Sequence, residues 1–248
     1  MLTIRELLAS CYRFYQRVFT FNQFNRDQWV AQRAQEIHAG AKVLDAGAGI
    51  GRYRPLFAHC DYRTQDFALE LGTIGRYTTL DYKSDITKIP VPESSFDVVI
   101  CTEVLEHVPE PIEAIKEFSR ILRSGGTLIL TAPLCSLLHQ EPYHFYGGYT
   151  PYWYQHFLSR NGFRVKEIQA NGRFFSLFGQ EARRFSALID PRRLPRRLWL
   201  LFPIISAMWI ITLPFNRVLF PVLGYCLDGL ELETMGTCGY HVVAVRER

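Results

Sequence analysis

The stretch Val43-Leu44-Asp45-Ala46-Gly47-Ala48-Gly49-Ile50-Gly51 decides the fold of this chain. A short apolar run ends at the acid Asp45, and glycines then follow at every second position. An apolar strand, an acid at its end and a glycine-rich turn before a helix are typical of the first unit of a doubly wound α/β domain. Gly47 and Gly49 permit positive φ angles, and because they have no Cβ they let a ligand approach the backbone closely.

The spacing of the third glycine indicates which ligand this turn accepts. A dinucleotide fingerprint, G-x-G-x-x-G, needs a glycine at position 52, and the residue there is Arg52. Gly51 comes one residue too early for that fingerprint. The variant suits a nucleoside ligand that has no pyrophosphate. It argues against a nicotinamide-dependent oxidoreductase or epimerase, and so does the lack of a Tyr-x-x-x-Lys pair in the chain.

Length and composition favour one α/β domain with additional elements. The chain has 248 residues, of which 48% are hydrophobic, and a formal net charge of +4. So small a charge does not indicate a nucleic-acid partner. The six cysteines are scattered without a C-x-x-C pair or a His/Cys cluster, so we expect no metal site and no disulfide framework. Reduced thiols fit a cytoplasmic protein, and the N-terminus does not read as a secretion signal.

Two helices are expected before the first strand. Residues 3–19 repeat apolar side chains with the period of an amphipathic helix. Such a helix packs on the domain or covers its site, and a position on a membrane surface is the alternative. A second helix is expected to begin at Asn25 or Asp27 as N-cap and to end at Gly40.

The second strand is expected over residues 62–67, closed by Asp66, after a short helix over 53–60. In a doubly wound sheet, the acid that ends the second strand lies where a ribose is bound by both hydroxyls. Asp81 competes for this role, but Gly72 and Gly75 predict a loop over 68–77, which favours Asp66. A role for either aspartate as a cap of a helix or turn stays open.

A second decisive stretch covers residues 95–107, Ser-Phe-Asp-Val-Val-Ile-Cys-Thr-Glu-Val-Leu-Glu-His. Its part from Phe96 to Cys101 reads as a continuous buried strand in a central parallel position. The turn behind the strand, with Thr102 and Glu103, opens at the carboxyl edge of the sheet, where ligands bind.

The motifs follow one another in a distinctive order. VLDAGAGIG comes first, then an acid about twenty residues on, then Asp85-Ile86 before a proline-bounded loop, and finally FDVVICTEVLEHV. In this order they resemble the class I (Rossmann-like) S-adenosylmethionine-dependent methyltransferases, and in particular the type 11 methyltransferase domain group. The resemblance covers roughly residues 40–170, and the tail 239–246 is compatible with it.

The resemblance implies a seven-stranded, mostly parallel, doubly wound sheet and the cofactor S-adenosylmethionine. The glycine turn would contact the methionine part and Asp66 the ribose. Asp85 would accept the adenine amino group and Ile86 would offer an amide to the ring, unless Asp85 is only a turn aspartate. The expected cofactor-binding set is Asp45, Gly47, Ala48, Gly49, Asp66, Phe67, Asp85, Ile86, Thr102 and Glu103.

The remaining elements follow from local signals. A helix is expected over 109–123, ended by Ser124-Gly125-Gly126, and a strand over 127–131. Thr150-Pro151 predicts the start of a helix that stops at Gly162. Strands are expected over 163–168 and 239–245, and the resemblance implies that the last strand is antiparallel to the others.

The acceptor side of the site is expected in the segment after residue 133. Relatives of this group carry a loop of the form H-x-x-P-x-x-x-Y, which His139, Pro142 and Tyr146 match. Gly147-Gly148 stand where an arginine is frequent, so an acceptor held by arginine is not supported. Methyl transfer needs mainly alignment, and it needs a base only for a protonated acceptor. We expect His139 as that base and Tyr146 as a positioning hydroxyl. Aromatic packing without proton transfer is the alternative, and His107 is expected to satisfy hydrogen bonds at a helix end.

Residues 173–237 are too long for a plain strand connection. Arginines come first, and an uncharged run of 18 residues then extends over 198–215, at the lower limit for a membrane span. Pro203 and Pro214 interrupt the run, and a single span would leave the last strand on the far side. A helix or helical hairpin lying in an anionic bilayer surface, through 192–227, fits this composition. Helices that cover the substrate site or form a homodimer contact are the alternative.

We therefore expect a single domain over 1–248, with N-terminal helices (1–40), a core (41–172), a basic and apolar helical insertion (173–237) and a last strand (238–248). The expected function is S-adenosylmethionine-dependent methylation of a small-molecule acceptor, hydrophobic or lipid-linked. A catalytically silent, membrane-attached scaffold of the same fold and an NAD-dependent enzyme are the alternatives. The expected location is the cytoplasm, peripherally at the inner face of the membrane.

Overall fold

The computed structural model describes residues 3–67, 79–230 and 236–247. Contacts between Cα atoms divide the chain into two compact units. We call Arg26–Asn171 with Gly239–Arg248 the sheet unit, and Met1–Asn25 with Gly172–Cys238 the helical unit. The loop predicted over 68–77, with Gly72 and Gly75, lies outside the described residues.

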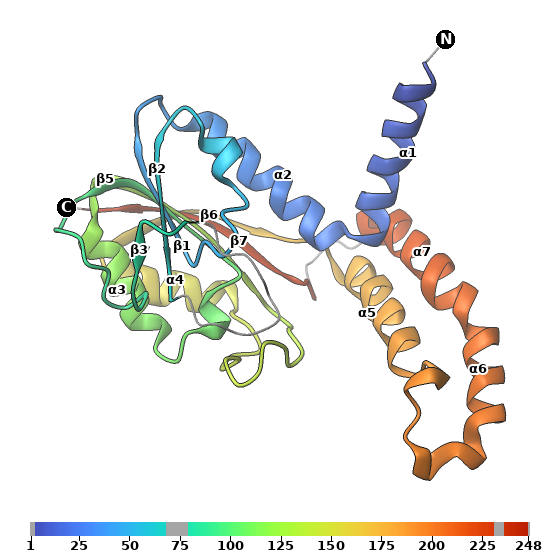
Figure 1. The fold of residues 1–248 in the computed structure, drawn as a ribbon. Helices are drawn as coiled ribbons and strands as arrows, with labels where there is room; N and C mark the ends of the chain where they lie inside the picture. The colour runs from blue at the N-terminus through green and yellow to red at the C-terminus, as the bar shows by residue number, and fades with distance from the viewer. Residues whose placement is uncertain (1–2, 68–78, 231–235, 248) are drawn as a thin grey trace. The chain divides into compact units, whose positions relative to one another are not determined.

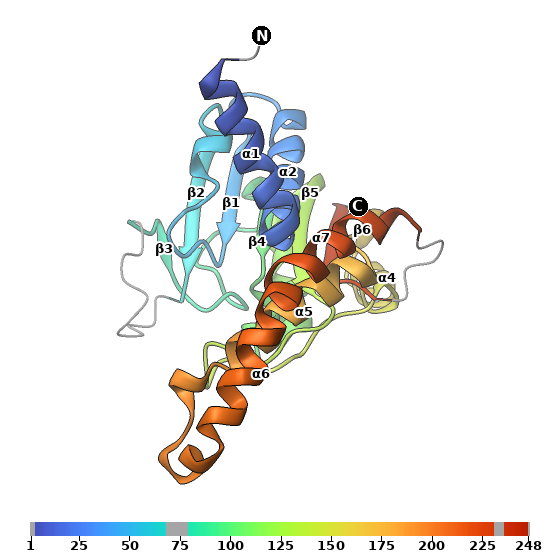
Figure 2. The ribbon, with the colours of Figure 1, turned by 90° about the vertical axis from the view of Figure 1, so that its right-hand side faces the viewer.

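The sheet unit is built on a seven-stranded sheet with the order β3-β2-β1-β4-β5-β7-β6 (Figures 1 and 2). Strands β1 to β5 pair in parallel, and β7 pairs antiparallel with both β5 and β6. This confirms the predicted doubly wound, mostly parallel sheet with an antiparallel last strand. The strands are β1 Lys42–Ala46, β2 Asp61–Asp66, β3 Tyr82–Lys83, β4 Phe96–Thr102, β5 Leu122–Pro133, β6 Phe163–Ala170 and β7 Gly239–Arg246.

Helices cover both faces of this sheet (Figure 1). Helices α3 (Pro111–Ile121) and α4 (Pro151–Arg160) bury an apolar face in one core, against the side chains of the central strands. The second half of α2 (Phe21–Glu36) buries Trp29, Val30 and Ala34 in a separate core on the opposite face. The central strands are therefore buried on both sides, which explains their continuous apolar sequences.

Several boundaries differ from the sequence prediction, and α2 ends at Glu36 rather than at Gly40. Helix α2 begins at Phe21, before the predicted caps, because Asp27 instead accepts hydrogen bonds from Arg52 and Tyr53. A short 3₁₀ turn, Arg54–Phe57, replaces the helix predicted over 53–60. Strand β5 begins five residues earlier than predicted, because Leu122 pairs with Phe96 of β4 before an irregularity in the register.

The helical unit consists of α1 (Ile4–Phe19), α5 (Phe174–Leu188), α6 (Phe202–Pro214) and α7 (Phe220–Leu227). A capping box opens α1, in which the Glu6 amide donates to Thr3 Oγ1 over 3.2 Å and the Thr3 amide donates to Glu6 Oε2 over 2.7 Å. Helices α6 and α7 belong to one helical segment that runs antiparallel beside α5 (Figures 1 and 2).

The long helical segment extends over Arg196–Leu230, 35 residues. Pro203 occupies the first turn of α6, directly after the 3₁₀ turn Arg196–Leu201, and its missing N–H costs no hydrogen bond at that position. Pro214 is accommodated by the π-helical stretch Phe215–Leu219 that follows it. Among the described residues, this is the one helix long and apolar enough to cross a membrane by length and composition, and none of its most apolar window is buried.

Candidate active site

A cavity of about 420 Å³ opens in the sheet unit at the carboxyl ends of β1, β2 and β4. This is the edge at which doubly wound sheets bind their ligands. The first group of lining residues comes from the strand ends and the loops behind them: Gly47, Gly49, Ile50, Gln65, Asp66, Phe67, Asp85, Ile86, Glu103 and Val104. The second group comes from the loops that follow: His107, Val108, Pro109, Gln140, Tyr143 and Phe145.

The glycine turn needs glycine for two different reasons. Gly47 has a φ of +76°, and a Cβ there would lie 2.4 Å from Val104 Cγ2, so no larger residue fits. Gly49 has a φ of +52°, and a Cβ there would meet nothing within 4 Å. The amides of Gly47 and Ala48 both donate to the Gln65 carbonyl, over 2.9 and 3.0 Å. These bonds hold the glycine turn against the end of β2. Because Gly49 has no side chain, the space in front of the turn stays open.

Asp66 and Asp81, the two candidates for binding the ribose, have different surroundings. Asp66 lines the cavity, and its Oδ2 accepts a hydrogen bond from the Gly49 amide over 2.8 Å. Asp81 instead accepts bonds from the Thr64 amide over 2.9 Å and from Arg63 Nη1 over 3.1 Å, and it does not line the cavity. The carboxylate at the end of β2 is therefore the one next to the glycine turn.

Asp45 lies in the sheet core and does not line the cavity. It accepts a hydrogen bond from the Tyr62 hydroxyl. Burial raises the pKa of Asp45 to about 6, although the bond from Tyr62 acts in the opposite direction. Asp45 thus supports the end of β1 from below, and the expected contact with the cofactor is not direct in this arrangement.

Asp85 and Ile86 both line the cavity. Asp85 Oδ1 also accepts hydrogen bonds from the Thr87 amide and the Thr87 hydroxyl, both over 2.8 Å. The turn-capping role that the sequence analysis left open is thus present, together with a position at the cavity.

Glu103 lies in the turn after β4, with a φ of +53°. Its Oε2 is 3.1 Å from Arg26 Nη1, and its Oε1 accepts a hydrogen bond from Thr131 Oγ1 over 2.8 Å. The carboxylate is therefore held in place at the cavity. Phe67 also lines the cavity and is 53% exposed, whereas the predicted residues Ala48 and Thr102 do not line it.

On the other side of the cavity, the loop over 134–149 folds against the turn after β4. The Phe145 amide donates to the Glu106 carbonyl over 2.9 Å, and His107 Nδ1 is 2.5 Å from the Tyr143 carbonyl. A carbonyl only accepts, so Nδ1 carries the proton and Nε2 is left as the basic nitrogen of the neutral ring.

The two predicted catalytic residues lie beside the cavity and do not line it. The Tyr146 hydroxyl donates to the Pro109 carbonyl over 2.9 Å. His139 Nδ1 is 2.9 Å from the Leu137 carbonyl, and its ring centroid is 4.8 Å from that of His107. Both residues therefore hold the loop in its place, and His107 is the histidine that reaches the cavity.

Burial shifts the pKa values of two groups in the turn after β4 in opposite directions. Desolvation lowers the pKa of His107, and the neighbouring His139 and His144 lower it further. Desolvation raises the pKa of Glu106 to about 8, and the charge of Glu103 adds to the effect. Glu106 Oε2 is buried and has no hydrogen-bond partner among the described residues.

Glu106, His107 and His139 also form a group that could hold a metal ion. Their ligand atoms all lie within 4.8 Å of one another. Carboxylate and imidazole ligands suit divalent cations of the first transition series. No metal site was expected from the sequence, because only the folding of the loop brings His139 to the other two residues.

The comparisons with known proteins agree with this geometry. Residues 44–130 match the profile of the methyltransferase domain family. A protein of Mycolicibacterium smegmatis named "Probable S-adenosylmethionine-dependent methyltransferase" is 31% identical over 115 residues, which cover 44% of this chain and 45% of that protein.

Two further relatives have more specific names. The demethylmenaquinone methyltransferase of Paenarthrobacter aurescens is 29% identical over 133 residues, covering 52% of this chain and 53% of its own. The ubiquinone biosynthesis O-methyltransferase of Xanthomonas campestris is 36% identical over 102 residues, covering 37% and 43%. The chain thus spans about half the length of the curated relatives it matches.

The fold is shared with solved structures. The phosphoethanolamine N-methyltransferase 2 of Haemonchus contortus, in complex with S-adenosyl-L-methionine, covers 90% of this chain and 53% of its own, with a TM-score of 0.51 and 15% identity. The sheet order and the cavity at the strand ends agree with the class I fold of S-adenosylmethionine-dependent methyltransferases. Residues 44–130 carry the methyltransferase domain that the matched profile describes, and S-adenosylmethionine is the cofactor of that class.

Proposed function

We propose that this protein transfers the methyl group of S-adenosylmethionine to a small hydrophobic acceptor. The observation that carries the proposal is the single cavity that joins two kinds of surface. One side offers the glycine turn and Asp66, and the other offers His107, Tyr143 and Phe145. An alkyl transfer needs two ligands held in line, and a cavity with two chemically different ends is suited to this task.

The residues at the first end fit the cofactor. The open space before Gly49 leaves room for the methionine part against the backbone. Asp66 would accept the ribose hydroxyls, Asp85 the adenine amino group, and Ile86 and Phe67 would contact the ring. When bound, the sulfonium supplies an activated methyl group whose leaving group is neutral, so the chain's own residues have mainly to align the acceptor.

A hydroxyl acceptor also needs to lose a proton, and we assign this step to His107. Its Nδ1 is engaged with the Tyr143 carbonyl, so its Nε2 is the nitrogen that takes the proton. Its lowered pKa keeps the imidazole neutral near pH 7, as a base must be. His139, the base expected from the sequence, packs against His107 and would act through it.

The walls of the acceptor end favour an apolar molecule. Val104, Val108, Pro109 and Phe145 line it, with few polar groups between them. Two relatives are named for steps on demethylmenaquinone and in ubiquinone biosynthesis. We therefore propose a phenol or quinol with an apolar substituent as the acceptor class. The cytoplasm, at the inner face of the membrane, and a homodimer stay part of this proposal.

Calorimetric titration and methyl labelling test the proposal together. We expect micromolar binding of S-adenosylhomocysteine and no binding of NAD, and transfer of a labelled methyl group to phenols or quinols with apolar tails. Binding of the first ligand without transfer to any acceptor would favour a silent scaffold. Binding of NAD alone would overturn the proposal.

A second form of the mechanism rests on the Glu106, His107 and His139 group, in which a divalent cation would bind the acceptor oxygen and lower the pKa of its hydroxyl. Dialysis against a chelator separates the two forms. Activity that survives dialysis supports His107 as a base. Activity that is lost and then restored by a single added metal supports the cation. His107→Asn is expected to lower kcat about 10²-fold or more in either case.

A further inference from the structure

The helical unit exposes many large apolar side chains on its surface. Helix α6 has no buried residue. Its side chains Phe202, Ile204, Met208, Ile210 and Ile211 are exposed, and Ile205, Trp209 and Leu213 on another side are half-buried. Leu200, just before it, is 94% exposed. A helix that is apolar all round is normally buried, either in protein or in lipid. The exposed side chains of this end are Leu198, Trp199, Leu200, Leu201, Phe202, Ile204, Met208, Ile210, Ile211 and Phe215.

Some polar groups of the same unit point inward. Ser186 of α5 is fully buried, and its carbonyl accepts a hydrogen bond from Trp209 Nε1 over 2.8 Å. Its hydroxyl accepts one from Arg217 Nε over 3.2 Å. Asn216, next to that arginine, is only 6% exposed. Polar groups inside and apolar groups outside is the arrangement found in proteins that lie in a bilayer.

Glycines bring α5 and α7 into close contact. A Cβ on Gly179 would lie 2.8 Å from Pro221 Cα, and a Cβ on Gly224 would lie 2.4 Å from the Phe175 carbonyl oxygen. Each glycine therefore lets the backbone of the opposite helix approach. Small residues at such crossings are characteristic of helix pairs in membranes, where packing replaces the hydrophobic effect.

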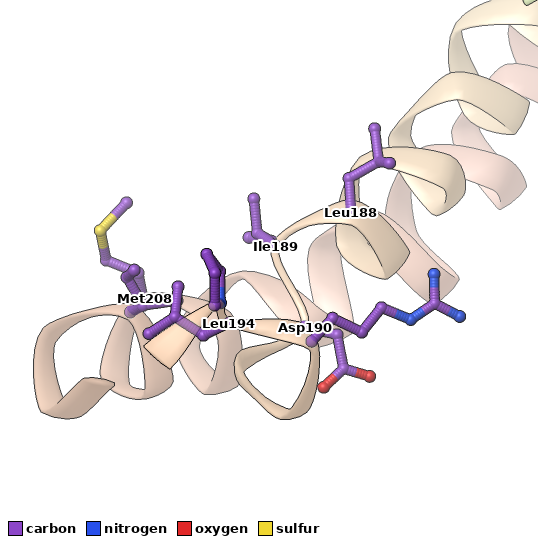
Figure 3. Close-up of a pocket in the computed structure, with 8 residues that line it drawn as sticks. Leu188, Ile189, Asp190, Leu194 and Met208 are labelled. Atoms are coloured by element: carbon purple, nitrogen blue, oxygen red, sulfur yellow. The ribbon is translucent and has the colours of Figure 1, made fainter. Parts of the chain in front are cut away.

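Arginines mark the turn between α5 and α6. Arg192, Arg193, Arg196 and Arg197 follow one another there, and Arg192 pairs with Asp190 over 2.6 Å. Next to them lies a cavity of about 230 Å³ with mainly apolar walls, where Leu188, Ile189 and Met208 point to one side and Asp190 to the other (Figure 3). Arginines beside exposed apolar residues and Trp199 suit the boundary between anionic headgroups and acyl chains.

The chain path limits how deep the unit enters. Its segment 172–238 leaves the sheet after β6 and returns into β7, and Ala170 and Tyr240 are register partners. Both ends are therefore on the same side of any membrane. Helix α5, which would have to form the return path, carries Glu181, Arg183 and Arg184 and is a poor span. The unit can enter one leaflet but not cross the bilayer.

We propose that the helical unit docks on an anionic lipid bilayer, with the exposed apolar side chains of residues 198–215 in one leaflet and the arginines of the turn, residues 192–197, on the headgroup phosphates. Helix α1 adds a second contact, because Ile4, Leu8 and Tyr12 are exposed along it and only Val18 is buried. This inference is independent of the proposed reaction, since no catalytic group takes part in it.

Vesicle flotation of the full chain tests the proposal. The chain is expected to float with phosphatidylcholine vesicles that contain phosphatidylglycerol, and less with phosphatidylcholine alone. The double variant Leu200→Glu/Ile211→Glu should lower the bound fraction at least tenfold. Arg196→Gln should lower binding to the anionic vesicles about fivefold, without affecting binding to the neutral ones. Tyr152→Glu in α4 of the sheet unit, where Tyr152 is 77% exposed, is the matched control and should float as the wild type does.

Two results would overturn the proposal. One is a wild-type chain that stays behind with both kinds of vesicle. The other is a double variant that floats like the wild type while circular dichroism shows unchanged helix content. Analytical ultracentrifugation tests whether a second copy of the chain occupies this surface instead of a bilayer. A wild-type dimer that the double variant dissociates, without any vesicle binding, would assign this surface to a second copy of the chain.

Discussion

Single residues fix the cofactor end of the site, and Gly47 has the narrowest tolerance among those of the glycine turn. Gly47→Ala combines an unfavourable φ with a clash against Val104. We expect it to reduce the free energy of unfolding by about 2–3 kcal/mol and to abolish measurable binding of S-adenosylhomocysteine. Gly49→Ala, with the same kind of φ but open space at its Cβ, should cost about 1 kcal/mol. Urea unfolding and calorimetry measure both, and equal losses of stability would contradict the role of Val104.

The neighbouring aspartates allow a matched comparison of ligand contact against structure. Asp66→Asn should weaken binding of S-adenosylhomocysteine about 10–100-fold, because a charged acceptor for the ribose hydroxyls is lost. Asp81→Asn should leave that affinity unchanged and reduce stability, since Asp81 bonds to Thr64 and Arg63, lies 4.0 Å from Arg54 and does not line the cavity. Calorimetric titration of both variants checks this, and a weakened Asp81→Asn variant would argue for the other aspartate.

Glu106 makes stability depend on pH in a defined direction. Its pKa is about 8 in the folded chain and near 4.5 when the chain is unfolded, so the folded state holds the extra proton between these values. Stability is therefore lost as pH rises through this window. Glu106→Gln stays neutral throughout. We expect its advantage in free energy of unfolding over the wild type to grow by on the order of 3 kcal/mol from about pH 5 to about pH 8. Denaturant unfolding with a chelator present measures it, and a constant difference would contradict it.

At the scale of elements, local signals decided which boundaries were predictable. The start of α4 is where the sequence predicts it, because Thr150 accepts a hydrogen bond from the Trp153 amide over 3.2 Å and Pro151 follows. The start of α2 was missed because Thr20, the residue before it, ends α1 and donates its hydroxyl to the Gln16 carbonyl, and because the polar Asp27 is used in contacts with distant residues. Caps are local chemistry, whereas such contacts depend on the finished fold.

The cap of α4 can be tested directly. Thr150→Ala removes the side-chain acceptor for the Trp153 amide and should reduce the free energy of unfolding by about 1 kcal/mol. Thr150→Ser keeps that acceptor and should be close to the wild type. Thermal or urea unfolding distinguishes the two variants. Equal stability of Ala and Ser at this position would show that Pro151 alone sets the start of the helix.

The two ends of the cavity were predictable to different degrees for the same reason. Gly47, Gly49, Asp66, Asp85 and Glu103 come from short motifs at strand ends, and the geometry of a doubly wound sheet brings strand ends together. At the acceptor end, Tyr143 and Phe145 lie on the loop over 134–149, which has no regular structure. Its shape depends on bonds such as that from the Phe145 amide to the Glu106 carbonyl, which no periodicity encodes.

At the scale of the molecule, the division into two units was not visible in the sequence. The first 25 residues group with the insertion, and within that unit Phe14 of α1 meets Tyr225 of α7 edge to face at 6.0 Å. Amphipathic periodicity predicted α1, but periodicity cannot say which apolar surface a helix joins. The prediction of a single folding domain stays a prediction.

Catalysis and membrane docking should be linked through the concentration of the acceptor. If the acceptor has an apolar tail, it partitions into vesicles, and a docked enzyme meets it there at a higher local concentration. We therefore expect anionic vesicles to lower the apparent KM for a tailed quinol and to leave the KM for its tail-free analogue unchanged. With the variant Leu200→Glu/Ile211→Glu, the vesicles should no longer lower the KM for the tailed quinol, and the KM for the tail-free analogue should again stay unchanged. Assays with a labelled methyl group measure the KM of the wild type and of the variant for both acceptors. An equal effect of the vesicles on the two acceptors would contradict the link between docking and catalysis.

The pairing of β6 with β7 has a consequence for the evolution of such a chain. The Asn171 amide donates to the Gly239 carbonyl over 2.9 Å, so the last residue before the 172–238 segment and the first one after it close like the ends of an ordinary reverse turn. A segment inserted between Asn171 and Gly239 leaves every strand of the sheet in register. The sheet unit can thus exchange the 172–238 segment for a tight turn, or for another segment, by insertion and deletion at one place.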